Sequence, residues 1–73
     1  LVIHEAPVKD YFDHIKLSFF IPNVGGIDTI IYNPNYKIKQ FKQGQKVKII
    51  GKLAINDFTS LMTINAVQVD ILD

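Results

Sequence analysis

The sequence predicts a mainly β domain of five strands and one short helix, and three observations support this prediction. Ile, Val and aromatic residues, which favour strands, fill nearly all the periodic segments. Apolar and polar residues alternate along several of them, as in strands with one buried face. Pro, Gly and Asn separate the segments and favour turns. With 73 residues and a hydrophobic content of 48%, residues 1–73 fit one small globular domain.

The clearest prediction is a hairpin. Residues 15–21 and 27–32 form its strands, and residues 22–26 supply Pro, Asn and Gly for its turn. The expected inward-facing residues are Ile15, Leu17, Phe19 and Ile21 in the first strand, and Ile27, Thr29 and Ile31 in the second.

The remaining elements complete the order strand, strand, strand, helix, strand, strand. Residues 1–5 and 8–12 are expected to form one long first strand, interrupted at Pro7. Residues 33–44 are expected to form the helix, with Asn33 as N-cap, Pro34 in the first turn and Gly44 at the end. Such a short helix is unstable alone and must pack as a plug, through Ile38 and Phe41.

The last two predicted strands span residues 46–53 and 61–72. The first of them alternates, and Gly51 suits a bulge or a sharp bend. In the second, the inward set is expected to switch near Ala66. Five strands with one helix between the third and fourth are the layout of an OB-fold, a partly open Greek-key barrel. A small SH3-like barrel is the alternative, but it has no natural place for a capped helix there.

Several classes of function are disfavoured. Without Cys there is no disulfide, thiolate zinc site or Cys nucleophile. No apolar run approaches the roughly 20 residues of a membrane span, and no signal peptide is visible. Asp10, Asp13 and His14 are read as an Asp-rich turn in preference to a metal site. We therefore expect no catalytic residue, metal or cofactor in this domain, and a cytoplasmic location. Because the chain starts at Leu1, we expect it to be part of a longer protein.

The charge is unevenly distributed. Six of the eight cationic residues, all of them lysines, lie in residues 29–56, which contain no acidic residue. That segment carries a charge of +6 and the remainder −5, within a formal net charge of +1. A basic segment of this kind attracts polyanions, although a lysine-rich face that keeps the domain soluble is an equal alternative.

A family resemblance adds to this reading. The run FKQGQKVKIIGKL at residues 41–53 resembles the corresponding run of nucleic-acid-binding OB domains. The runs HIKL at 14–17, GKLAINDF at 51–58 and LMTINAV at 61–67 resemble the OB domain of RecJ-type single-strand-specific exonucleases. The run IYNPNY at 31–36 is similar to the wedge OB domain of RecG-like helicases. In either family the OB domain guides the DNA strand and does no chemistry, so a divalent metal would belong to the parent nuclease.

The predicted site combines aromatic side chains for base stacking with lysines for phosphates. Its residues are Tyr11, His14, Lys16, Phe20, Tyr32, Lys46, Lys48, Lys52, Asn56 and Phe58. In the alternative, Phe20 and Ile30 dock against a neighbouring domain, because exposed apolar patches often mark protein contacts. Either Phe12 or Phe58 could instead plug the end of the barrel. The absence of arginine disfavours bidentate base reading, so little sequence preference is expected.

The sequence therefore predicts an accessory domain that binds single-stranded DNA in an exonuclease of DNA repair or recombination. A structural or protein-interaction OB module is the second hypothesis, and the wedge domain of a RecG-like helicase is a further alternative. An enzyme in its own right is the third hypothesis. The expected partners are single-stranded DNA and other domains of the parent chain.

Overall fold

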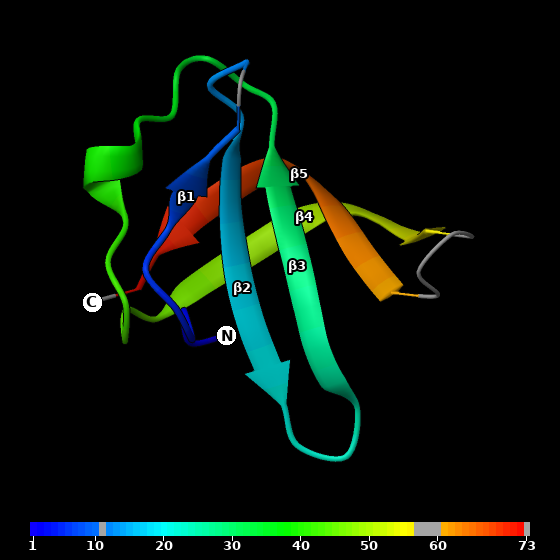
Figure 1. The fold of residues 1–73 in the computed structure, drawn as a ribbon. Helices are drawn as coiled ribbons and strands as arrows, with labels where there is room; N and C mark the ends of the chain where they lie inside the picture. Colours follow the sequence, from blue (N-terminus) through cyan, green and yellow to red (C-terminus); the bar gives the residue numbers. More distant parts are fainter. Residues whose placement is uncertain (11, 57–60, 73) are drawn as a thin grey trace.

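The computed structural model describes residues 1–10, 12–56 and 61–72, and it is mainly β as predicted. Its strands form one mixed sheet in the order β1-β2-β3-β5-β4 (Figure 1). The strands are β1 (Val8–Lys9), β2 (Ile15–Ile21), β3 (Gly25–Ile31), β4 (Val47–Asn56) and β5 (Leu61–Ile71). Neighbouring strands are antiparallel, except that β3 and β5 are parallel.

The β2–β3 hairpin forms the centre of the sheet and carries much of the core. Leu17 of β2 pairs with Thr29 of β3, and both are fully buried. The predicted inward residues are buried, apart from the half-buried Ile21. Asn23 and Gly25 turn the chain with positive φ values of 70° and 107°. The core cluster is completed by Ile3, Phe41, Val47, Ala66 and Val69.

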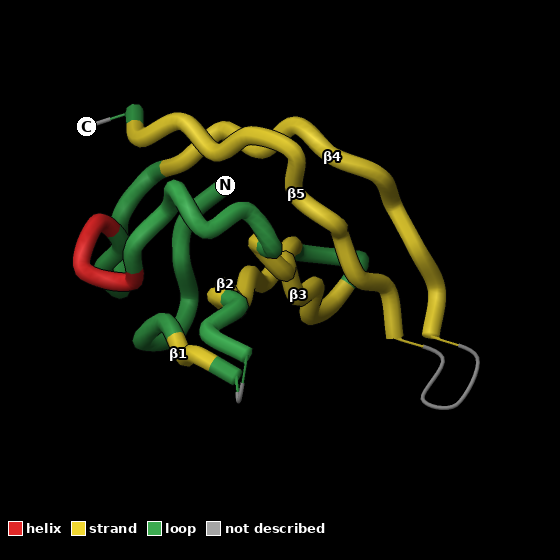
Figure 2. Tube along the Cα trace, turned by 90° about the horizontal axis from the view of Figure 1, so that it is seen from above, coloured by secondary structure: helices red, strands yellow, loops and turns green. Residues whose placement is uncertain are grey.

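The β4–β5 ribbon arches over the rest of the sheet (Figure 2). Its register shifts between Ile50 and Gly51, which leaves Val67 as an extra residue on β5. The inward side of β5 therefore switches between Ala66 and Val69, both of which are buried. The predicted bulge at Gly51 and the predicted switch near Ala66 are confirmed.

The predicted long first strand is wrong, because β1 has only two residues. The N-terminal segment instead forms isolated bridges, Val2 with Lys46 and Ile3 with Phe19. Pro7 cannot donate to a ladder, and the turn that follows Asp10 diverts the chain before a longer strand can form. Residues 1–4 thus lie between β2 and the start of β4, and no continuous ladder closes the sheet within the described residues.

The predicted helix over residues 33–44 is also wrong, because the segment contains only a 3-10 turn, η1 (Ile38–Gln40). Asn33 does not begin a helix; its side chain accepts a hydrogen bond from Asn35 N–H at 2.9 Å and so forms a local turn. The backbone is extended at Lys37 and again at Phe41. Two apolar anchors, Ile38 and Phe41, are too few to stabilise several helical turns, although both pack on the core. No helix of the described residues has the length and apolarity needed to cross a membrane.

Candidate nucleic-acid interface

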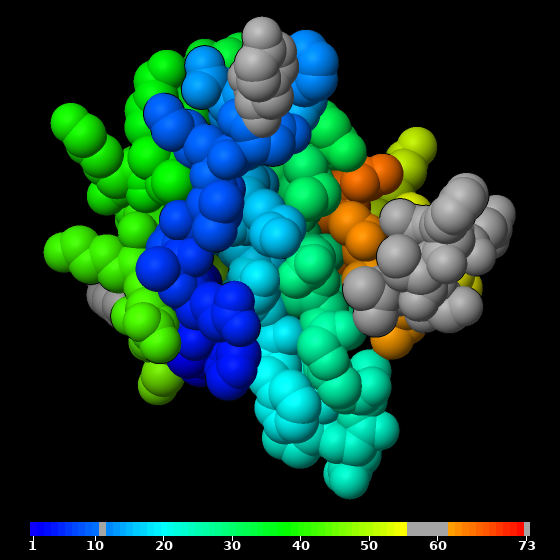
Figure 3. Space-filling view, viewed as in Figure 1, coloured from blue at the N-terminus to red at the C-terminus, as the bar shows by residue number. Residues whose placement is uncertain are grey.

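The side chains of β2 and β3 that point away from the core form the surface that we call the outer face. Its residues are Lys16, Ser18, Phe20, Asp28, Ile30 and Tyr32, the last of which follows β3 directly. Atoms of β2 and β3 form a continuous exposed strip beside the N-terminal segment (Figure 3). Phe20 and Tyr32 are 59% and 52% exposed, so both aromatic rings are accessible to a ligand.

The strand register extends the outer face to β4. Ile30 pairs with Lys16 on one side and with Asn65 of β5 on the other, and Asn65 pairs with Lys52. Residues that pair directly in a sheet point to the same face. Lys16 and Lys52 therefore lie in one row, roughly 14 Å apart along the sheet at three strand spacings. The row therefore joins Lys16, the predicted cation of β2, with Lys52, one of the predicted cations of β4.

Three aromatic rings gather at one end of the outer face. The ring centroids of His14 and Tyr32 are 4.5 Å apart in an edge-to-face arrangement. The Phe12 ring follows at 6.0 Å from His14 and is 73% exposed. Phe12 therefore does not plug the core. A hollow of about 130 Å³ lies beside these rings, with His14, Lys16 and Ile30 among its lining residues.

Asp10 fixes this end of the outer face. Its Oδ1 accepts hydrogen bonds from the N–H groups of Phe12 and His14, both at 2.8 Å, and its Oδ2 lies 2.9 Å from His14 Nδ1. Desolvation raises the pKa of the Asp10 carboxyl, but the hydrogen bonds from His14 and Phe12 outweigh it and leave the pKa below its ordinary value. A carboxylate thus orients the His14 ring before any ligand arrives.

The other end of the outer face is built differently. Phe20 pairs with Gly26, which has no side chain to cover it, and its ring lies 5.9 Å from that of His4. Five residues of β3 lie between Gly26 and Tyr32, so the two ends are six residue steps apart, a distance of roughly 20 Å. Between the two ends Ser18 Oγ donates a hydrogen bond to Asp28 Oδ1 at 3.0 Å. The stacking surface is therefore two separate patches with a carboxylate between them.

The other predicted cations are less well placed. Lys48 pairs with Asp70 in the register, so a carboxylate faces it across the strands. Lys46 is exposed beside the N-terminal segment, where it bridges Val2. Tyr11 and Phe58 lie outside the described residues, and Asn56 is described only as the end of β4. The structure thus brings together four of the predicted residues, namely His14, Lys16, Tyr32 and Lys52, and places Phe20 at the far end.

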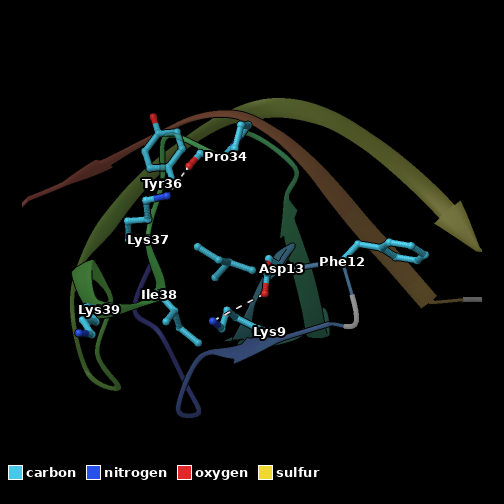
Figure 4. Close-up of a pocket in the computed structure, with 9 residues that line it drawn as sticks. Lys9, Phe12, Asp13, Pro34, Tyr36, Lys37, Ile38 and Lys39 are labelled. Carbon is cyan, nitrogen blue, oxygen red and sulfur yellow. Dashed lines mark hydrogen bonds and ion pairs between the residues drawn. The ribbon is translucent and has the colours of Figure 1, made fainter.

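The sequence reasoning missed one feature entirely, which is a cavity of about 510 Å³ next to the three-ring end. Lys9, Phe12, Asp13 and Ile15 line one wall, and Pro34 and residues 36–39 line the other (Figure 4). Three lysines line it, Lys9, Lys37 and Lys39, and only Asp13 opposes them in charge. The clustering of lysines in the connector between β3 and β4 (residues 32–46) was visible in the sequence, but the cavity that Lys37 and Lys39 line was not. His4, which contacts Phe20, was missed as well.

Comparisons of the chain with protein-family models, curated proteins and solved structures find no match. The described residues contain no group of three or more His, Asp or Glu side chains arranged to hold a metal ion.

Proposed function

We propose that this chain is an OB-fold accessory domain that binds single-stranded DNA on the outer face of β2 and β3. The observation that carries the proposal is the single row that joins Lys16 and Lys52, next to the rings of His14 and Tyr32. Bases stack on aromatic rings while lysines attract the phosphates, a combination typical of strand binding without sequence preference. The domain would serve as one module of a RecJ-type exonuclease in DNA repair or recombination and would carry no catalysis itself.

The topology supports the OB-fold part of the proposal. An OB-fold is a partly open Greek-key barrel of five strands whose β2–β3 face binds oligonucleotides. The sheet order β1-β2-β3-β5-β4, with a parallel β3–β5 pair, is compatible with this layout. The N-terminal segment also reaches both neighbours that a closing strand would need, since Ile3 N–H donates to Gln45 O at 2.9 Å and His4 N–H to Ser18 O at 2.7 Å.

The two patches differ in their expected contribution to binding. The end with Tyr32 and His14 is preorganised by Asp10 and lies beside Lys16, so binding there costs little ordering entropy. The Phe20 end has His4 beside it, and the Asp28 carboxylate separates it from the Tyr32 end. We therefore expect Tyr32 to contribute more to affinity than Phe20.

Fluorescence anisotropy with oligo-dT tests this function. The 73-residue chain should bind at low salt, and its affinity should fall steeply as salt rises, because phosphate contacts release counterions. Replacing Tyr32 by Ala should weaken binding by roughly 5- to 150-fold, the worth of one base stack of about 1–3 kcal/mol. Leu53→Ala, at an exposed residue on the opposite side of its strand from Lys52, is the matched control and should leave binding unchanged. Absence of binding at tens of micromolar protein in low salt would exclude the proposal.

A protein-interaction module is the second candidate, and one specific observation favours it. Leu53 and Ile55 are each 63% exposed. They lie on one side of the β4–β5 ribbon, and in the other half of the ribbon the same side faces the core. Exposed apolar surface of this kind often marks a docking site. If Leu53→Ala lowers the affinity of the chain for another domain of its parent while oligo-dT does not bind, this candidate replaces the first. A helicase wedge domain is a third possibility, and Walker motifs elsewhere in the parent sequence would support it.

A further inference from the structure

The cavity lies between two segments of the chain, with Lys9, Phe12, Asp13 and Ile15 on one side and residues from Pro34 to Lys39 on the other. A single 3-10 turn stands where a helix was expected, and Tyr36, Ile38 and Phe41 of this segment pack on the core. Ile15, which is 2% exposed, forms the inner wall of the cavity. Its volume of about 510 Å³ lies within the usual range of small-molecule sites, about 300–1,000 Å³.

We propose that this cavity binds the terminal nucleotide of a DNA single strand, with its monophosphate between Lys9 and Lys37. The base would lie against the apolar wall formed by Ile15, Ile38 and Tyr36. This inference rests on the proposed function, because it extends the same strand from the outer face to its end.

The walls of the cavity divide into an apolar part and a cationic part. Ile38 is half-buried and points towards Lys9 across the cavity (Figure 4). Tyr36 is held in place from behind, because its hydroxyl accepts a hydrogen bond from Val69 N–H at 3.1 Å and its ring lies 6.3 Å from that of Phe41. A fixed aromatic ring beside aliphatic side chains is a suitable surface for a base.

The contacts that Lys9 and Lys37 make within the chain are weak. Lys9 Nζ lies 3.7 Å from Asp13 Oδ1, and the Lys9 side chain is half exposed and that of Asp13 largely exposed. Lys37 Nζ donates to the Pro34 carbonyl oxygen at 3.1 Å, also on the exposed surface. Exposed contacts of this kind contribute little free energy. A phosphate, which accepts charge-assisted hydrogen bonds, can therefore take both ammonium groups from these partners.

The position of the cavity favours the end of a strand over its middle. Phe12 lines the cavity, and its ring is 6.0 Å from His14, which in turn contacts Tyr32 on the outer face. A strand stacked on Tyr32 and His14 therefore reaches the cavity within its next nucleotides. The buried Ile15 closes the inner side, so the strand cannot pass through.

The test uses the 15N-labelled 73-residue chain titrated at low salt with thymidine monophosphate, thymidine or inorganic phosphate, followed by amide chemical shifts. Thymidine monophosphate should shift the signals of Lys9, Ile15 and Ile38, and thymidine should shift the same signals only at roughly tenfold higher concentration, since it lacks the charged group. Lys37→Gln should weaken binding of the monophosphate about threefold, as expected for one exposed ion pair, and leave that of thymidine unchanged. Lys42→Gln, outside the cavity on the same connector, is the control.

The inference would be overturned if about 10 mM thymidine monophosphate caused no shifts, because the affinity would then be too weak for a site. Shifts confined to Tyr32 and Phe20 would also overturn it. Equal shifts with inorganic phosphate would overturn it as well, because the base would then play no part in recognition. The two proposals fail separately. Binding of oligo-dT without cavity shifts overturns this inference alone. Cavity shifts without binding of oligo-dT overturn the proposed function and reduce the cavity to a mononucleotide site.

Discussion

The two halves of β4 carry the same alternating pattern but have different surroundings. In residues 47–50, Val47 is fully buried and Ile49 packs on the core. In residues 51–56, Leu53 and Ile55 occupy the same side of the strand and are each 63% exposed. The first half is covered by the N-terminal segment and by Phe41 of the connector, whereas the described residues leave Leu53 and Ile55 of the second half exposed. Alternation thus defines the side that a residue faces, while other segments decide whether anything covers it.

Gly51 separates the two halves, and its replacement should have the largest effect. A Cβ atom at this position would overlap the Asn65 carbonyl oxygen and lie 2.9 Å from Ala66 Cα. Both are backbone atoms, so β5 would have to move. We expect Gly51→Ala to lower the free energy of unfolding by roughly 2–3 kcal/mol, the upper range for overpacking, as measured by urea denaturation. Gly26→Ala is the control, because its Cβ would meet only the Phe19 carbonyl oxygen at 3.9 Å. Equal losses in the two variants would contradict the role of Gly51.

Two valines of the paired strand β5 allow a matched test of how burial by other segments affects stability. Val69 lies opposite Ile49 and is 5% exposed, whereas Val67, at the bulge, is 65% exposed. Val69→Ala should cost roughly 2 kcal/mol, because it removes two buried methyl groups and leaves a cavity. Val67→Ala should change stability by less than about 0.5 kcal/mol. Thermal unfolding followed by circular dichroism measures both, and a similar loss in both variants would show that the second half is covered too.

Tyr36 contributes to the covered half in another way. β5 continues beyond its last residue paired with β3, so the Val69 N–H has no partner on that strand. It donates a hydrogen bond to Tyr36 Oη instead. Tyr36→Phe removes the acceptor and leaves a partly buried donor without a partner, at a cost of roughly 1–2 kcal/mol. Tyr32→Phe removes a hydroxyl from an exposed ring and should cost less than about 0.5 kcal/mol. Denaturant titration of both variants would reveal whether the connector stabilises β5 at this point; an unchanged Tyr36→Phe variant would show that it does not.

The same distinction explains how much of the structure was predictable from the sequence. The hairpin, the inward residues of β2 and β3 and the bulge at Gly51 depend on local alternation and on turn residues, so they were predicted correctly. The helix and the long first strand were wrong because tertiary contacts and local side-chain hydrogen bonds decide them. Asn33 and Asp10 each accept backbone hydrogen bonds that favour a turn over a regular element.

In the candidate site too, local features were predictable from the sequence, whereas features that depend on tertiary contacts were not. That Lys16, Phe20 and Tyr32 face outward was evident from alternation. That Lys16 and Lys52 share one row could not be predicted, because it depends on the register of four strands. The cavity beside η1 was missed for the same reason, since it joins segments far apart in the sequence. The Ser18–Asp28 hydrogen bond was missed because it depends on the exact register of the hairpin.

Lysines on the two halves of β4 should differ in DNA binding. Lys52 lies in the row with Lys16, whereas Lys48 pairs with Asp70. We expect Lys52→Gln to weaken oligo-dT binding about threefold at low salt and to reduce the salt slope by about one contact. Lys48→Gln should change the affinity less, because the carboxylate of its paired residue Asp70 lowers the positive potential on that part of the strand. Anisotropy titrations at several salt concentrations compare the two; a larger effect of Lys48 would move the interface to the other half of the ribbon.

The smallest effect on stability is expected at Thr29, which is completely buried. Thr29 is 0% exposed, and its hydroxyl oxygen has no hydrogen-bond partner among the described residues. A buried hydroxyl without a partner costs free energy that a methyl group of similar size does not. Thr29→Val should therefore leave the free energy of unfolding unchanged or raise it by up to about 1 kcal/mol, because the β-branched shape between Leu17 and Ile64 is kept. Thr29→Ser keeps the hydroxyl but removes a buried methyl group, so it should be less stable by about 1 kcal/mol. If Thr29→Val proved the less stable of the two, the hydroxyl would have to be paired, and the interior between β2 and β5 would be more polar than its residues indicate.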